Sequence, residues 1–132
     1  MRIFGIMAGL MLAAGPATAD EVWSTDLGDI IYEAEEAGAA ILSFGGFDGY
    51  RGTLVLPGLA GNYEQRGVHH GYWIGTSGVD CGAALTGPTG NASRAWGQAV
   101  VAFDGPAFPT SFTVSLGDCF GPLNRSIRAV AR

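Results

Sequence analysis

The chain contains no lysine, and its 7 basic side chains, all arginine, are outnumbered by 12 acidic ones. Strong nucleic-acid binding depends on basic side chains that displace the counterions condensed on phosphates, so this acidic chain is not expected to bind nucleic acid. The lack of lysine also excludes the phosphate-binding loop of P-loop proteins, which needs a Gly-Lys pair. A dinucleotide-binding glycine fingerprint and the Gly-x-Ser-x-Gly motif of serine hydrolases are missing as well.

Long hydrophobic runs are also missing, because no stretch reaches the roughly 18 apolar residues that a spanning helix needs. The amino-terminal segment instead resembles a secretory signal peptide, with Arg2, an apolar run over residues 3–14 and the small residues Ala17 and Ala19. Residues 1–19 are therefore expected to be a signal peptide that is removed on export. The remainder, residues 20–132, is expected to be a single β domain without a membrane span, in a periplasmic or secreted location.

Cysteine is scarce, with only Cys81 and Cys119 in the sequence. Both lie in the part that we expect to be exported, and an even number of cysteines in an oxidising compartment predicts a disulfide. The C-x-x-C spacing of redox-active pairs and the closely spaced ligands of zinc sites are absent. We therefore expect one structural disulfide, no metal and no other cofactor.

Sustained helical periodicity is rare, whereas alternation of apolar and polar residues recurs. Over residues 29–35, Ile30, Tyr32 and Ala34 alternate with acidic neighbours, which predicts a strand with these three side chains facing the core. A helix over residues 32–42 is the competing interpretation, because Glu and Ala favour helices. A glycine inside that segment and the lack of a continuing apolar stripe favour a hairpin instead.

Eight short segments show strand patterning, with Gly, Pro, Asn and Asp between them. The connections are too short to hold crossover helices, so the strands are expected to be antiparallel. The pattern predicts an all-β fold, either a small antiparallel β-barrel or a β-sandwich of about eight strands. The expected strands cover residues 29–35, 40–44, 52–56, 68–74, 83–86, 96–103, 111–116 and 123–130.

Both histidines lie in the aromatic-rich segment 61–73. Adjacent residues of a strand point to opposite faces, so His69 and His70 are not expected to bind one metal ion. One of them could act as a general base with Glu64 or Asp80 as the orienting carboxylate. In the alternative interpretation, one histidine is exposed and the other packs among the neighbouring aromatic side chains.

Aromatic residues beside arginines in predicted loops have the composition of an interface hot spot. Phe47, Tyr50, Tyr63 and Phe108 fall in such loops. The predicted binding surface consists of Tyr50, Arg51, Tyr63, Glu64, Arg66, His69, His70, Tyr72 and Trp73.

These observations predict a binding protein and not an enzyme. It would serve as an inhibitor, ligand carrier or accessory subunit, with a protein partner or a small-molecule ligand in the cell envelope. Two alternatives remain open, a small hydrolase that uses a histidine and a carboxylate, and a structural component of an envelope assembly. Residues 20–50 contain acids but no arginine, and arginines outnumber acids over residues 51–132. An acidic face and a mildly cationic remainder would steer a basic partner.

Overall fold

The computed structural model describes residues 21–47, 50–59, 66–76, 78–106 and 110–132, so the expected signal peptide lies outside it. Within these ranges every regular element is a β-strand, as the sequence predicts. None of the described residues forms a helix of the length and apolarity that a membrane crossing requires. The described strands are β2 (Val22–Thr25), β3 (Gly28–Glu36), β4 (Ala39–Phe47), β5 (Tyr50–Pro57), β6 (Val68–Gly75), β7 (Leu85–Thr86), β8 (Ala92–Ser93), β9 (Trp96–Phe103), β10 (Phe112–Gly117) and β11 (Leu123–Ala131).

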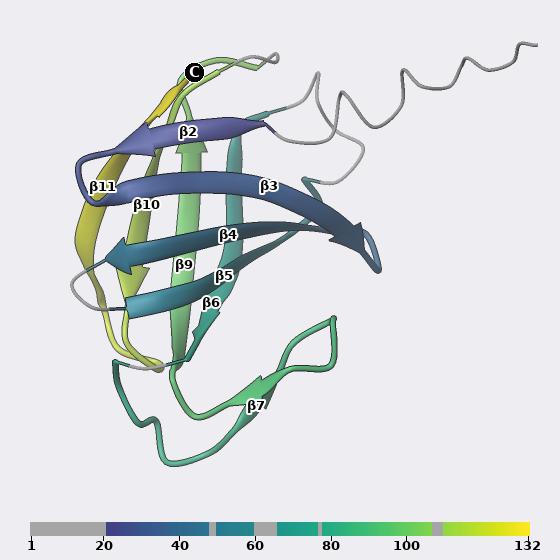
Figure 1. Cartoon of the computed structure of the whole chain (residues 1–132), viewed down its shortest axis with the longest axis vertical. Coiled ribbons are helices and arrows are strands. Elements are labelled where there is room, and N and C mark those ends of the chain that lie inside the picture. The colour runs from purple at the N-terminus through teal and green to yellow at the C-terminus, as the bar shows by residue number, and fades with distance from the viewer. Residues whose placement is uncertain (1–20, 48–49, 60–65, 77, 107–109) are drawn as a thin grey trace, which may run out of the picture.

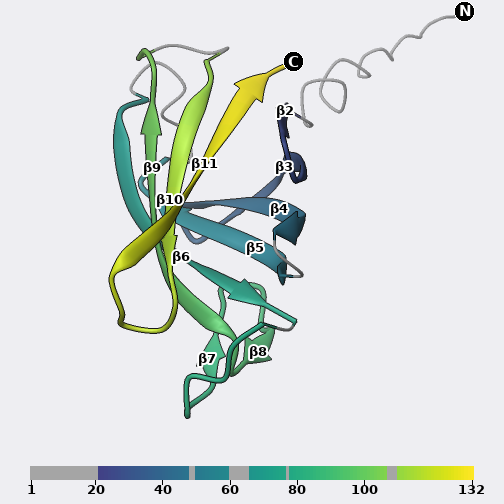
Figure 2. The same cartoon turned by 90° about the vertical axis from the view of Figure 1, so that its left-hand side faces the viewer.

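Eight of these strands form one closed antiparallel barrel, so the fold is a barrel and not a sandwich. The order around the barrel is β2, β3, β4, β5, β6, β9, β10 and β11, and β11 pairs back to β2. Each strand pairs with the next barrel strand along the chain, which is the up-and-down arrangement. Strands β2 to β5 run across β9 to β11 (Figure 1), and the hairpin of β7 and β8 lies below the barrel (Figure 2).

One predicted strand lies outside the barrel, and one barrel strand was not predicted. Residues 76–95, which we call the insert, connect β6 to β9. The strand predicted at residues 83–86 lies in this insert, where β7 pairs with β8 in a small hairpin outside the barrel. The eighth barrel strand is β2 instead. It has only four residues, too few to show a clear alternation, and it is held by pairing with β3 and with the distant β11.

Alternation along the strands builds the core. In β10, Phe112, Val114 and Leu116 are buried while the residues between them are partly exposed, as predicted. Each large apolar side chain that is removed from water contributes roughly 1.5–3 kcal/mol. The inward-facing side chains pack into one cluster, formed by Trp23, Ile30, Tyr32, Ala40, Leu42, Phe44, Leu54, Leu56, Leu59, Trp73, Ala95, Ala99, Val101, Phe112, Val114, Leu116 and Ala129.

Strand β3 departs from this alternation at a bulge. Tyr32 pairs with Leu42, but Ala34 pairs with Ile41, which leaves Glu33 as the extra residue. The extra residue reverses which side chains face inward. Ala34 is therefore exposed, and its predicted place in the core is wrong.

The turns on either side of β4 correct two further expectations. Ala37 and Gly38, with φ of 53° and 82°, form a two-residue hairpin turn whose positive φ values match type I′. This hairpin excludes a helix over residues 32–42. At the other end, β4 continues to Phe47 and β5 begins at Tyr50, so both residues belong to strands and not to the predicted loop.

The barrel end near the start of β6 is closed around Arg66. Its Nη1 and Nη2 donate to the two carboxylate oxygens of Glu21 at 2.8 and 2.6 Å. The guanidinium carbon lies 6.0 Å from the ring centroid of Trp23 and 5.1 Å from that of Phe103. Trp23 in turn donates its indole N–H to the carbonyl of Thr110 at 2.8 Å. Charge pairing and ring contacts therefore close this end together.

At the opposite end, two glycines let Trp73 reach the backbone. Its Nε1 donates to the carbonyl of Gly117 at 2.8 Å. A Cβ on Gly97 would lie 1.8 Å from that carbonyl oxygen and 2.4 Å from Trp73 Nε1, so no other residue fits at this position. This contact fixes the end of β10 and hence the start of the β10–β11 connection.

The variant Gly97→Ala should lower the free energy of unfolding by about 2–4 kcal/mol, because it overpacks the contact and displaces a buried hydrogen bond. Urea denaturation measures this difference. Gly67→Ala is the matched control, because a Cβ at Gly67 would meet no atom within 4 Å. The control should change stability by less than about 1 kcal/mol. Equal stability of the two variants would contradict the close contact.

The variant Glu21→Gln should cost about 3–5 kcal/mol of stability, because it removes the charge of the carboxylate that binds the buried Arg66 guanidinium through two hydrogen bonds. Thermal and urea unfolding measure the loss. Asp104→Asn serves as control, because its ion pair with Arg128 is half-exposed and screened by water. A Glu21→Gln protein as stable as the control would show that the buried pair does not hold the barrel end.

Candidate binding surface

Strand β6 separates the predicted site residues onto two faces, as its alternation requires. Trp73, which is 1% exposed, and His69 point inward, and His69 packs edge-on against Phe103. His70 and Tyr72 lie on the outer face, where partial burial raises the pKa of Tyr72. The two histidines therefore face apart, and the described part of the chain contains no group of three His, Cys, Asp or Glu that could hold a metal ion.

The remaining described residues of the predicted surface differ in exposure. The side chain of Arg66 is fully buried in its pair with Glu21, so Arg66 and Trp73 stabilise the barrel and are not exposed for binding. Arg51 is exposed at the start of β5. The other predicted positions lie outside the described residues, namely Tyr63, Glu64, Phe108 and the side chains of Phe47 and Tyr50.

A more prominent exposed group lies in the β10–β11 connection. Phe120 is 84% exposed, more than any other large hydrophobic side chain that the structure describes. Its ring packs edge-on against Trp96, with centroids 4.9 Å apart and an interplanar angle of 73°. Phe120 is not among the residues predicted for the binding surface, although its position between a cysteine and a Gly-Pro pair is a signal that could have distinguished it.

The loop that carries this ring is fixed by its own hydrogen bonds. The N–H of Gly121 donates to the carbonyl of Asp118 at 2.8 Å, which closes a turn. Within that turn, the N–H of Cys119 donates to the carbonyl of Trp96 at 2.9 Å. Arg125 Nη2 donates to Asp118 Oδ1 at 3.0 Å. These contacts tie the loop to both β9 and β11.

The predicted disulfide between Cys81 and Cys119 is present and joins this loop to the insert. Cys119 has φ of 56°, a left-handed conformation that costs about 1–2 kcal/mol for a residue with a Cβ. Such a conformation persists only where surrounding contacts fix it, and it is concentrated at functional sites. We call Cys81, Trp96, Cys119 and Phe120 together the Phe120 platform.

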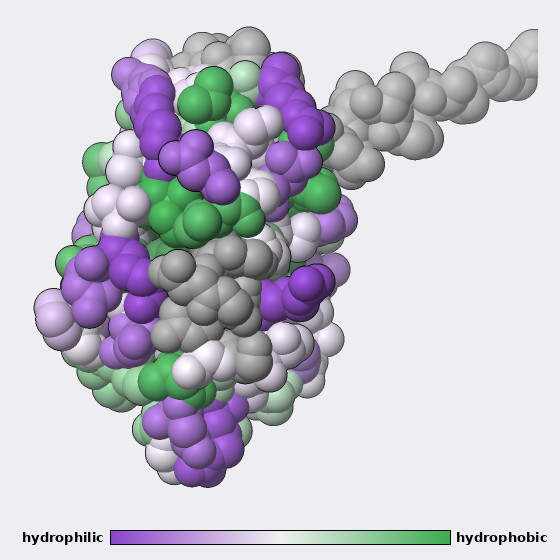
Figure 3. Space-filling view, turned by 60° about the vertical axis from the view of Figure 1, so that its left-hand side comes forward, coloured by the Kyte–Doolittle hydropathy of each residue, from purple (hydrophilic) through white to green (hydrophobic). Residues whose placement is uncertain are grey.

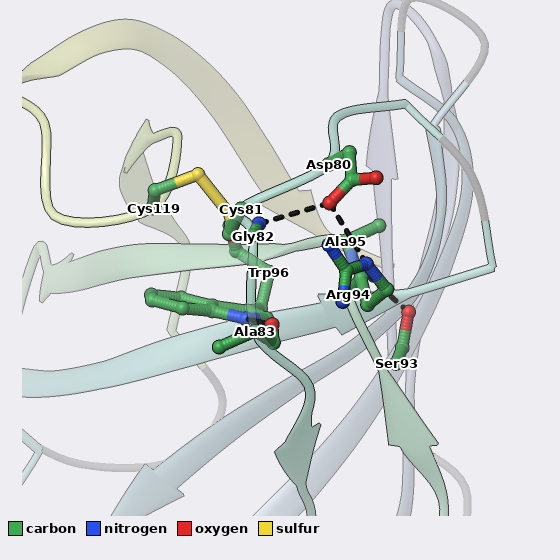
Figure 4. Close-up of polar contacts among 9 residues, drawn as sticks. All are labelled: Asp80, Cys81, Gly82, Ala83, Ser93, Arg94, Ala95, Trp96 and Cys119. Atoms are coloured by element: carbon green, nitrogen blue, oxygen red, sulfur yellow. Dashed lines mark hydrogen bonds and ion pairs between the residues drawn. A yellow bond between two sulfur atoms is a disulfide. The ribbon is translucent and has the colours of Figure 1, made fainter.

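The insert is held beside the platform by the contacts in Figure 4. Trp96 Nε1 donates to the carbonyl of Ala83 at 2.9 Å. Asp80 Oδ1 accepts from the N–H of Gly82 and from Arg94 Nε, each at 2.9 Å. The hydrogen bond from Gly82, with that from Arg94, holds the pKa of the Asp80 carboxyl below its usual 3.8. Asp80, which the sequence suggests as the orienting carboxylate of a histidine, thus binds Gly82 and Arg94 within the insert instead.

An open depression of about 410 Å³ lies next to this ion pair. Its volume falls within the range of small-molecule sites, but it is a hollow of the surface and not an enclosed cavity. The depression adds a concave region to the end of the barrel that carries the insert. It is lined by Thr76, Val79, Asp80, Ala84, Ala92, Ser93, Arg94 and Ala95.

Ion pairs reduce the charge separation that the sequence suggests. Glu21 and Asp29, from the acidic amino-terminal segment, pair with arginines of the later segment. The hydrogen bond from Arg128 also holds the pKa of Asp104 below its usual value. On the face in Figure 3, hydrophilic residues in purple surround smaller hydrophobic patches in green. The described pairs are Arg66–Glu21, Arg94–Asp80, Arg125–Asp118, Arg128–Asp104 and Arg132–Asp29.

None of the protein-family models, curated proteins and solved structures compared with the chain matches it. No ligand, partner or reaction is therefore transferred from a related protein. The functional conclusion depends on the exposed residues and their contacts.

The double variant Cys81→Ser, Cys119→Ser should lower the free energy of unfolding by about 4 kcal/mol. In the chain-entropy model, the disulfide closes a loop between positions 38 residues apart and so restricts the unfolded chain, and the variant loses this restriction. Urea denaturation of the parent and the variant measures the loss. The parent in a reducing agent is the matched control and should unfold like the variant. Thiol titration of the native parent should find no reactive thiol, and a positive titration would contradict the disulfide.

Proposed function

We propose that the chain is an exported, non-enzymatic binding domain that docks on a partner protein through the Phe120 platform. The observation that carries this proposal is the 84% exposure of Phe120 on a loop fixed by hydrogen bonds and a disulfide. Aromatic side chains dominate the binding energy of many protein interfaces. Loops on a rigid scaffold are the usual carriers of binding residues.

The rigidity of the loop supports this proposal on energetic grounds. Association costs free energy for every flexible side chain and loop that becomes ordered. The turn, the disulfide and the contact with Trp96 have already ordered this loop. Covering a phenylalanine ring contributes roughly 1.5–3 kcal/mol, so most of that gain remains for binding.

The geometry favours protein binding on the outer surface over catalysis by a histidine and a carboxylate, and over ligand binding inside the barrel. His69 and His70 face apart and Asp80 is bound to Arg94, which gives little support to a histidine–carboxylate hydrolase. The inward-facing side chains of the barrel pack against one another, which favours the outer surface over the interior as the binding region. An inhibitor or an accessory subunit in the cell envelope fits this picture.

The proposed location is the periplasm or the extracellular space. A disulfide is compatible with an oxidising compartment and is uncommon in reducing ones. The apolar segment at residues 3–14, followed by small residues, supports export by a signal peptide.

The variant Phe120→Ala should weaken binding to the partner by about tenfold or more, because an anchor side chain contributes about 1.4 kcal/mol or more. The partner is first identified by mass spectrometry of material that copurifies with the full-length gene product, and its affinity is then measured with purified components. Val68→Ala is the matched control, because Val68 is 61% exposed on the outer face of β6, outside the platform.

Both variants should keep the parent's circular dichroism spectrum and melting temperature, because both side chains are exposed. Unchanged affinity of Phe120→Ala, or an equal loss for both variants, would contradict docking through the platform.

A further inference from the structure

We infer that the partner binds the ring of Phe120, at the tip of a turn, in an apolar pocket. The inferred site differs from the extended cleft in which a protease binds the chain that it cuts. This inference rests on the proposed function and specifies the chemistry of the partner.

The backbone around Phe120 has the wrong shape for an extended cleft. The chain reverses between Asp118 and Gly121, whose hydrogen bond closes the turn. Cys119 has a positive φ and Phe120 does not, which is the sign pattern of a type II′ turn with Phe120 at its second central position. Clefts that recognise a strand require several consecutive residues in extended conformation. The turn therefore presents the side chain of Phe120 to a partner, and not an extended backbone segment.

The backbone donors on both sides of Phe120 are also engaged. The N–H of Cys119 donates to the carbonyl of Trp96, and the N–H of Gly121 donates to the carbonyl of Asp118. A partner that recognised the backbone as an added strand would need such donors for its main-chain hydrogen bonds. Since these two are used inside the protein, the ring of Phe120 is the recognition group.

Two charged pairs on the segments that form the platform point to a neutral pocket. Asp118 on the same turn is paired with Arg125 at 3.0 Å, and Asp80 on the neighbouring insert is paired with Arg94 at 2.9 Å. Each of these carboxylates thus has a cation beside it, so the two pairs add no net charge next to the platform. Association through an apolar anchor should therefore depend little on salt, in contrast to steering by unpaired charges.

Photocrosslinking tests the pocket directly. A benzophenone analogue of phenylalanine replaces Phe120 in the full-length gene product, and the same analogue at Val68 is the matched control. Cells that produce the protein are illuminated, and the crosslinked peptides are identified by mass spectrometry. The expected result is a crosslink from position 120, and not from position 68, to apolar side chains of one protein. When the illumination is repeated in cell extracts, the yield of the crosslink from position 120 should be unchanged between about 0.05 and 0.5 M salt.

A chymotrypsin-type protease is the second probe, because its specificity pocket accepts a phenylalanine presented in an extended chain. The oxidised protein should neither inhibit this protease nor be cut after Phe120. The reduced, unfolded chain should be cut there and serves as the control. Stoichiometric inhibition by the oxidised protein would overturn the pocket and leave the proposed function standing, with a protease as the partner.

The other outcomes separate the two proposals. Crosslinks from position 120 to lipid, to a second copy of this chain or to a charged surface with salt-sensitive yield would overturn the apolar pocket. Absence of any crosslink at position 120 above the level at position 68 would overturn the Phe120 platform as the docking surface, and with it the proposed function.

Discussion

All three tryptophans donate their indole N–H to a backbone carbonyl in, or at the edge of, a connecting segment, and the ends of the barrel depend on these hydrogen bonds. Trp23 binds Thr110 in the β9–β10 connection, Trp73 binds Gly117 at the start of the β10–β11 connection, and Trp96 binds Ala83 in the insert. Each ring also fills space between strands or under a loop. A buried indole without a partner would be costly, so packing and hydrogen bonding fix these connections together.

The barrel could be predicted where one face of a strand is buried and the other is not. Strand β10 shows this best, with its apolar residues inside and its hydroxyl residues outside. Strand β2 and the bulge at Glu33 could not be predicted in the same way. A four-residue strand has too little pattern, and the position of a bulge depends on the partner strand, which the local sequence does not contain.

The candidate site was less predictable, because exposure is a tertiary property. Arg66 looked like a surface residue, but its partner Glu21 lies 45 residues away in sequence and draws it into the barrel end. Phe120 looked like one aromatic residue among many. Its exposure depends on Trp96 beneath it and on Cys81 in a separate segment, and no local pattern contains that arrangement.

Pairing of β2 with β11 means that the barrel closes only when both ends of the described part of the chain are in place. Val130 lies opposite Ser24 and Ala131 opposite Trp23, so the final seam joins segments more than a hundred positions apart. Contacts of such long range form late, after the intervening loops have been brought together. While β11 is still unfolded, β2 has only one of its two neighbours, β3, so the barrel closes only when segments from both ends of the described chain have met.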